Sequence, residues 1–242
     1  TSFKNHKHIN IIDINYKEAK GVCWARNLIQ QHYNDEDFTL QLDSHHRFTE
    51  GWDTTLKNMI YMLQLQGHKK PLLTGYVPSY DTLTGKTEND PWQLVFDRFA
   101  PEGPLHTKPE TIPNWVDYNA PIAARFFSAH FCFTLGIFSR EVQHDPEIYF
   151  HGEEISLAVR AYTHGYDLFH PHRVVIWHYY TRSDQPRHWS DNDGWVELDT
   201  QSHTKVRKLL GIDGEFIAEE DKCEYGLGNE RTLEDYEKYA GV

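Results

Sequence analysis

The spacing of apolar residues along the first third of the chain changes between helical and strand-like patterns. Within residues 52–63 they recur at i, i+4, i+7, i+8 and i+11, which places them on one face of an α-helix, and Gly67 is suited to end it. The apolar runs Phe38–Leu42 and Pro71–Tyr76 are shorter and are typical of strands. This part of the chain therefore predicts a strand, a helix and a second strand in that order.

Similar patterns extend over the rest of the sequence. Helices are predicted over residues 18–33, 153–164 and 198–210, and a last short helix begins after Thr232 as its N-cap. Strand-like segments cover residues 8–13, 125–138, 167–169 and 174–178. Strands that alternate with helices predict an α/β fold, with a mostly parallel central sheet flanked by helices. We expect one domain over residues 1–242, in which residues 212–242 form a C-terminal extension.

A proline-rich stretch interrupts this alternation between Val77 and Ala120. Six prolines and two glycines lie in a polar context there, which predicts a long loop. Long loops inside compact domains are more often functional than idle. We expect this loop to shape a binding site. The alternative is a surface loop without a function.

Composition excludes several classes of function. The chain carries 24 Lys and Arg against 36 Asp and Glu, a net charge of −12, which disfavours binding to nucleic acid or to an anionic membrane surface. No stretch is long and apolar enough for a membrane span. The three cysteines are widely spaced, which argues against a disulfide framework and favours a reducing compartment. We therefore expect a cytoplasmic protein.

Metal-competent side chains follow two of the predicted strands. Asp43 and His45 come directly after one strand, and His178 ends another. Because strand ends converge at one edge of an α/β sheet, one carboxylate and two imidazoles would form a three-ligand site with open positions. Taken singly, each residue also fits an ordinary turn or a hydrogen-bonded strand end.

Two helix starts carry further candidates. Glu153 and Glu154 lie at a predicted helix N-terminus, where acids also stabilise the helix dipole, so a structural role is equally compatible. Gly21 at the start of another helix would let a ligand approach the backbone, and Arg26 follows one turn later, where it could meet a phosphate. Ordinary surface charge is the alternative for Arg26.

Five blocks of sequence stand out together. They are Ala19–Arg26, Leu40–His45, Phe127–Ala129, Gly152–Arg160, and Asp167–Pro171 with Val175–His178. Taken together they resemble the GlcNAc-transferase family, whose members modify hydroxyproline of a cytosolic ubiquitin-ligase subunit or threonine of parasite mucins. The resemblance runs in order from about Ile11 to Tyr239, and a more distant likeness connects the chain to the polypeptide GalNAc-transferases.

The resemblance implies a GT-A fold and a retaining transfer from a UDP-sugar, with GlcNAc as the expected sugar and a hydroxyl of a polypeptide or glycan as the acceptor. It also implies a divalent cation, Mn²⁺ or Mg²⁺, that stabilises the UDP leaving group. By this likeness, Asp43 and His45 form an Asp-x-His motif that binds the metal, and His178 is the third ligand.

The resemblance also suggests roles around this motif. Glu153 and Glu154 would bind sugar or acceptor hydroxyls as catalytic-site residues, and Arg26 and Asp43 would lie at the nucleotide. A mobile loop would close over UDP; its members are Tyr179, Tyr180, Arg182 and Trp189.

One departure and two rival functions accompany this interpretation. Only one short strand precedes the helix that starts at Gly21, so we expect the first nucleotide-binding strand and helix of such enzymes to lie upstream of Thr1.

A non-haem Fe(II) oxygenase uses the same two histidines and carboxylate, but on an antiparallel barrel and in the order His-x-Asp. The third hypothesis is a noncatalytic sugar-binding module.

Overall fold

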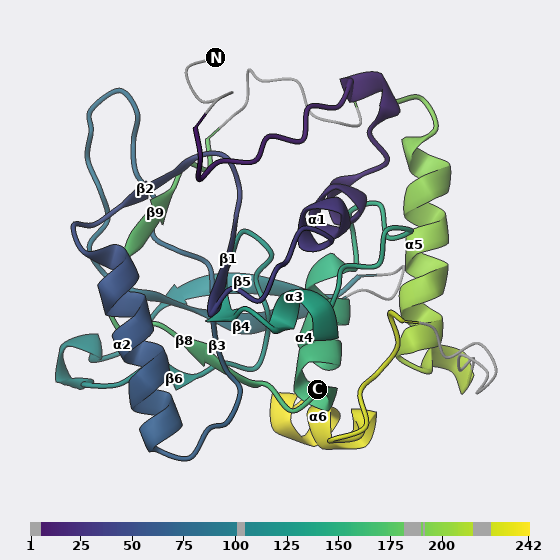
Figure 1. Ribbon diagram of the computed structural model, residues 1–242. Helices are drawn as coiled ribbons and strands as arrows, with labels where there is room; N and C mark the ends of the chain where they lie inside the picture. The colour runs from purple at the N-terminus through teal and green to yellow at the C-terminus, as the bar shows by residue number, and fades with distance from the viewer. Residues whose placement is uncertain (1–5, 101–104, 182–189, 191, 215–223) are drawn as a thin grey trace.

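The computed structural model describes residues 6–100, 105–181, 190, 192–214 and 224–242. Its centre is a five-stranded sheet in the order β1-β7-β3-β8-β6. Figure 1 labels β1, β3, β6 and β8 of this sheet. The strands are β1 (Phe38–Leu42), β3 (Pro71–Thr74), β6 (Ile122–Ala123), β7 (Phe131–Leu135) and β8 (Asp167–His170).

The prediction of a mostly parallel sheet was wrong. Only β3 and β8 pair in parallel, whereas β1 with β7, β3 with β7, and β6 with β8 are antiparallel. The physical reason is the insertion of β7 between β1 and β3, because it runs against both and no helical crossover precedes it. β1, β3 and β8 nevertheless share one direction, so their carboxyl ends lie at the same edge.

Helices cover both faces of this sheet. Helix α2 (Trp52–Leu65) buries Leu56, Ile60 and Leu63 against one face, in the cluster that also holds Leu73. On the other face, α4 (Glu153–Thr163) packs in the cluster that holds Leu72. Adjacent strand residues point to opposite faces, so one strand contributes to both clusters. The helical periodicity of residues 52–63 and the start of the predicted helix at Glu153 are confirmed.

The C-terminal helix α6 (Leu233–Ala240) packs beside α4. Thr232 is its N-cap as predicted, and its side chain and that of Asp235 form a reciprocal capping box. Tyr236 is buried in the same cluster as α4, and its hydroxyl donates to the carbonyl of Arg125 at 2.9 Å. The helix is therefore fastened to the core by both packing and a hydrogen bond.

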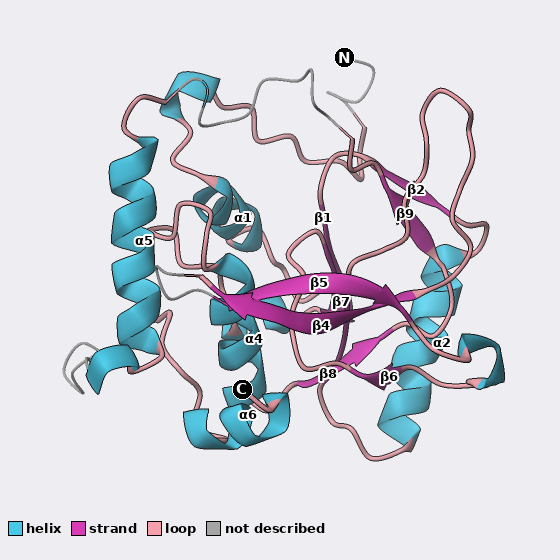
Figure 2. Ribbon diagram, turned by 180° about the vertical axis from the view of Figure 1, so that it is seen from behind, coloured by secondary structure: helices cyan, strands magenta, loops and turns pink. Residues whose placement is uncertain are grey.

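Two smaller sheets lie outside the central one. β4 (Trp92–Phe99) and β5 (Leu105–Thr111) form a hairpin that crosses the molecule in Figure 2. The prediction of one continuous loop over residues 77–120 was therefore wrong. Pro109 suggested a loop, but it lies within β5. Proline is compatible with a strand that has no partner on its other side, and among the described residues β5 pairs only with β4. β2 (His46–Phe48) and β9 (Ile176–His178) form the other ribbon.

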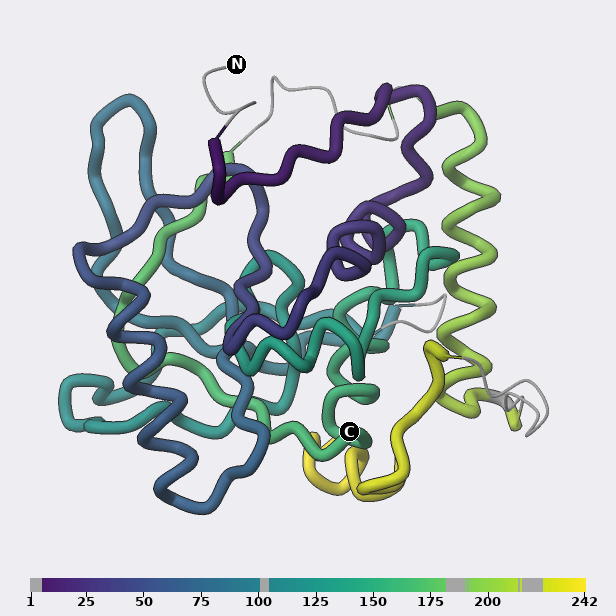
Figure 3. Tube along the Cα trace, viewed as in Figure 1, coloured from purple at the N-terminus to yellow at the C-terminus, as the bar shows by residue number. Residues whose placement is uncertain are grey.

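The amino-terminal part differs from prediction as well. Residues 8–13 form no strand; they run as an extended segment (purple in Figure 3) toward a short 3-10 turn, η1 (Tyr16–Glu18), and then to α1 (Val22–Gln30). Gly21 has φ +117, and a Cβ there would lie 2.4 Å from the carbonyl oxygen of Tyr149. The glycine therefore permits close backbone packing, which accounts for it without a ligand.

Two α-helices and two short 3-10 helices complete the described part of the chain. Helix α5 stands along one side of the molecule in Figures 1 and 3, and α3 follows β7 directly. The remaining bounds are α3 (Phe138–Glu141), η2 (Trp115–Asp117), α5 (Trp195–Leu209) and η4 (Ile212–Gly214).

Candidate active site

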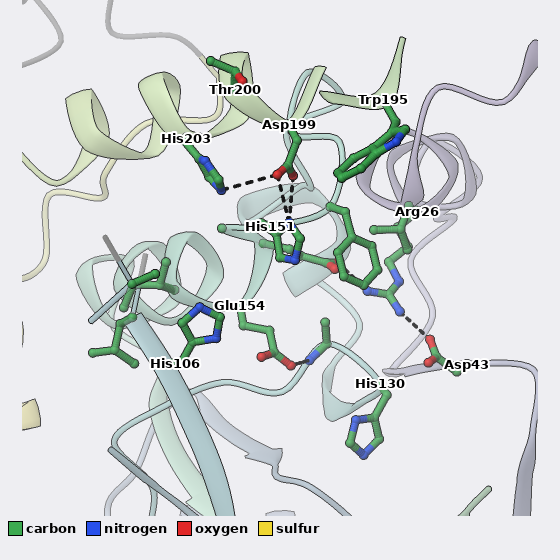
Figure 4. Close-up of a pocket in the computed structure, with 18 of the residues that line it drawn as sticks. Arg26, Asp43, His106, His130, His151, Glu154, Trp195, Asp199, Thr200 and His203 are labelled. Carbon is green, nitrogen blue, oxygen red and sulfur yellow. Dashed lines mark hydrogen bonds and ion pairs between the residues drawn. The ribbon is translucent and has the colours of Figure 1, made fainter. Parts of the chain in front are cut away.

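A cavity of about 790 Å³ opens where α1, the end of β1, the start of α4 and the first half of α5 meet. Residues widely separated in sequence line it, and Figure 4 shows many of their side chains pointing into the same space. Its volume lies in the usual range for small-molecule sites, roughly 300–1,000 Å³. Its polar lining includes Arg26, Asp43, His130, Glu153 and Glu154.

Asp43, His45 and His178 lie together at the edge of this cavity. Asp43 and His45 follow β1, while antiparallel pairing of β2 with β9 sets His46 opposite His178 and brings His178 to them. The Nε2 atoms of His178 and His45 lie 3.6 Å and 3.9 Å from Asp43 Oδ2. One nitrogen or oxygen from each residue lies within 4.8 Å of the others, so the three side chains could hold one metal ion.

Other aromatic rings surround His178. The ring centroids of His46 and His130 lie 4.7 Å from that of His178, and the Tyr180 centroid lies 4.3 Å away. Burial lowers the pKa of His46 to about 4 and lowers the pKa of His130 as well. Because neutral imidazoles add no positive charge, these neighbours do not repel a cation bound at His178.

Arg26 connects the metal-competent cluster to α4. Its Nη2 donates to Asp43 Oδ1 at 2.7 Å and its Nη1 donates to Glu153 Oε1. His144 Nε2 lies 3.0 Å from the same oxygen of Glu153. Burial alone would raise the pKa values of both acids, but His178 and Arg26 at Asp43, and Arg26 and His144 at Glu153, outweigh it and lower both. Both carboxylates are therefore ionised at neutral pH.

Glu154 faces the cavity in a different electrostatic setting. Its Oε1 accepts a hydrogen bond from the backbone N–H of Ala129 at 3.0 Å, and the Tyr76 hydroxyl donates to Oε2 at 3.4 Å. Burial raises the pKa of Glu154 to about 7, and the charge of Glu153 adds to the rise. Near neutral pH this carboxyl can accept or donate a hydrogen bond.

The family model described as "Glycosyltransferase (GlcNAc)" matches residues 1–242, the whole chain. The chain belongs to this glycosyltransferase family. The resemblance inferred from the five sequence blocks is thereby confirmed, and the family favours the glycosyltransferase hypothesis over the iron oxygenase.

A solved structure has a fold similar to that of this chain. The chain superposes on GalNAc-T7, crystallised with UDP, GalNAc and Mn²⁺, with a TM-score of 0.55 and 12% identity. The match covers 92% of this chain and 42% of the GalNAc-T7 chain, so this chain spans less than half of its neighbour. No curated protein matches the sequence. Among the described residues, no helix has the length and apolar character to cross a membrane.

The structure places most of the predicted site residues around one cavity. Asp43, Arg26, Glu153 and Glu154 line it, and Asp43 is the member of the metal-competent cluster that reaches it. Tyr180 also lines it, and its hydroxyl donates to the carbonyl of Val77 at 2.7 Å. Tyr179 is bound to the β2 side through its N–H, which donates to the carbonyl of His45. Arg182 and Trp189 lie outside the described residues.

Sequence reasoning missed several residues of this site. His130 and His144 belong to no motif with a recognisable spacing. Because the chain has 16 histidines, neither of these two could be singled out from the sequence. Asp199 and His203 are four residues apart in a predicted helix, a spacing that places both side chains on one face. That spacing was the one available signal, and it gains meaning only because α5 lies beside the cavity.

Proposed function

We propose that the protein is a GT-A glycosyltransferase that moves a sugar, GlcNAc as the expected one, from a UDP-sugar to a hydroxyl acceptor with retention of configuration. Membership of the GlcNAc glycosyltransferase family over the whole chain supports the reaction class. The observation that carries the proposal is the convergence of Asp43, His45 and His178 at the rim of a cavity large enough for a nucleotide-sugar.

The donor set fits a first-row divalent cation such as Mn²⁺. One carboxylate and two imidazoles suit a first-row divalent ion and leave positions for oxygens. Both ring nitrogens of His178 are buried and, among the described residues, have no hydrogen-bond partner, which is costly unless something else satisfies them. GalNAc-T7 was crystallised with UDP and Mn²⁺, which supports the same pairing here. A bound cation would supply charge stabilisation for a departing diphosphate.

The residues behind the cluster have separate tasks in this proposal. Arg26 holds Asp43 in place and supplies positive charge at the nucleotide side, and Glu153 positions Arg26 from behind. Glu154 hydrogen-bonds a sugar or acceptor hydroxyl, since its carboxyl faces the cavity and can donate or accept near neutral pH. A front-face retaining transfer needs no protein nucleophile, because the acceptor hydroxyl attacks beside the departing phosphate. The donor would bind with its diphosphate toward Asp43 and its sugar toward Glu154.

UDP release from a panel of UDP-sugars, with and without Mn²⁺, tests the proposal. We expect release to be fastest with UDP-GlcNAc, to depend on the cation, and to fall on the order of 100-fold or more in Asp43→Asn. Asp53→Asn is the matched control, because Asp53 is an exposed aspartate of α2 that pairs with Lys57. Equal activity of Asp43→Asn and the unaltered chain would refute the metal assignment. UDP binding without any turnover would instead indicate a noncatalytic sugar-binding module.

A further inference from the structure

A second cluster of metal-competent side chains lines the same cavity away from Asp43. In Figure 4 the imidazoles of His151 and His203 converge on the carboxylate of Asp199. His151 Nδ1 lies 2.9 Å and 3.0 Å from the two oxygens of Asp199, and His203 Nε2 lies 3.7 Å from Oδ2. One nitrogen or oxygen from each residue lies within 4.8 Å of the others. The proposed glycosyl transfer uses none of these three side chains.

The main chain holds the two halves of this cluster in a fixed relation. Asp199 and His203 are one turn apart on α5, so their side chains share one face. His151 lies in the segment before α4, and α5 is fastened to that segment at several points. The Tyr149 N–H donates to Ser202 Oγ at 2.8 Å, and Lys205 Nζ lies 2.7 Å from Asp145 Oδ2.

The residue beside His151 shows how closely the two elements fit. Gly152 has φ +92, and a Cβ there would lie 2.5 Å from Cγ2 of Val206 in α5. Only glycine allows this approach, which sets α5 near enough for Asp199 to meet His151. The cluster is therefore built into the packing of α5 on the start of α4, unlike a chance meeting of long surface side chains.

We propose that His151, Asp199 and His203 form a second divalent-cation site, of the type that binds Zn²⁺. Two ligand atoms on a tetrahedral zinc ion lie about 3.3 Å apart, because the bonds are about 2.0–2.1 Å long. Asp199 Oδ2 lies 3.0 Å from His151 Nδ1 and 3.7 Å from His203 Nε2, and these two separations bracket that value. Two imidazoles favour Zn²⁺ over the hard cations Mg²⁺ and Ca²⁺.

An ion at this position would have an open side. Three protein ligands leave at least one tetrahedral position, as in zinc sites that bind water or substrate. His151, Asp199 and His203 all line the cavity, so the open position would face it and could take an oxygen of a bound molecule. The ion would also join α5 to the loop before α4. The inference does not depend on the glycosyltransferase proposal.

Zinc titration followed by calorimetry tests this site with Zn²⁺ itself as the probe. We expect His203→Gln to bind one Zn²⁺ fewer than the unaltered chain, or to lose at least tenfold in affinity at one site. His151→Gln, at a half-exposed position, should give the same result and guards against misfolding of the first variant. Co²⁺ in place of Zn²⁺ should give visible absorption of tetrahedral type that both variants lose.

The control is His68→Gln, a histidine paired with an aspartate at another place. His68 Nδ1 lies 2.7 Å from Asp167 Oδ2, and Asp167 is also bound by Arg231, so an arginine takes the place of a second imidazole. This variant should leave zinc stoichiometry unchanged. The inference is overturned if His203→Gln and His151→Gln bind zinc within threefold of the unaltered chain. Asp43→Asn in the same titration isolates the other cluster, so failure of UDP-sugar turnover and failure of this site are separate results.

Discussion

Replacing Arg26 by methionine should destabilise the fold strongly, because it removes the shared partner of two acids. The guanidinium is 10% exposed and lies between Asp43, which is 30% exposed, and Glu153, which is 6% exposed. Breaking a buried ion pair from one side costs about 3–5 kcal/mol, since the other charge stays buried. Solvent screens Asp43 in part, so most of this cost falls on Glu153. We expect the free energy of unfolding to fall by about 3–5 kcal/mol.

Urea unfolding at pH 7.5, followed by circular dichroism, measures this loss. Lys238→Met is the matched control, because Lys238 makes a solvent-exposed pair with Glu234 one helical turn away and should leave the free energy of unfolding nearly unchanged. The double variant Arg26→Met with Glu153→Gln should recover at least about 1 kcal/mol, because the stranded charge is gone. A loss below about 1 kcal/mol in Arg26→Met, or purely additive losses in the double variant, would refute this reasoning.

The pair of Arg26 with Glu153 also predicts how the stability of the fold changes with pH. Burial alone would raise the pKa of Glu153, but Arg26 and His144 outweigh it and lower that pKa in the folded protein. The stabilisation from this group is therefore present above the ordinary pKa of glutamate and is lost as pH falls through the lowered folded pKa. The difference in stability between Arg26→Met and the unaltered chain should accordingly shrink in acid.

Two further variants test other parts of the site. The folded pKa of Glu154, about 7 against an ordinary 4.5, means that ionisation weakens the fold as pH rises through this interval, so Glu154→Gln should gain up to about 3 kcal/mol relative to the unaltered chain between pH 5 and pH 8. Urea unfolding at both pH values measures this gain, and a difference that does not change with pH would contradict it. Gly152→Ala should lose about 2–4 kcal/mol in thermal or urea unfolding, because the new Cβ meets Val206 in a left-handed backbone conformation. Gly51→Ala, also left-handed but with open space around it, should lose only about 1 kcal/mol, and equal losses would show that the contact with Val206 is unimportant.

Local features of the fold could be predicted from the sequence. The face of α2, the start of α4 at Glu153 and the cap at Thr232 depend on residues within a few positions of one another. Side-chain spacing and capping chemistry act over that same range. The end of β1 at Leu42, directly before Asp43, was predictable for the same reason.

The pairing of segments that lie far apart in the chain could not be predicted from the sequence. The direction of β7 depends on how the chain returns after the β4–β5 hairpin, and no local pattern specifies it. The register of β9 against β2 brings His46 to His178, and the segment before β7 brings His130 there; neither contact has a signal in the sequence. Arg26 was a candidate for a phosphate contact, yet its partners in the structure, Asp43 and Glu153, come from two other elements.

The narrow ribbon of β2 and β9 also bears on how the molecule is made. His46 pairs with His178, a partner that lies more than half the length of the chain later in the sequence. Contacts of such long separation form late, because the entropy of closing the intervening loop must be overcome first. During synthesis Asp43 and His45 emerge long before His178, the third proposed ligand. A chain from which β9 has not yet emerged therefore presents only two of the three ligands, and the full cluster is a sign that most of the domain has already folded.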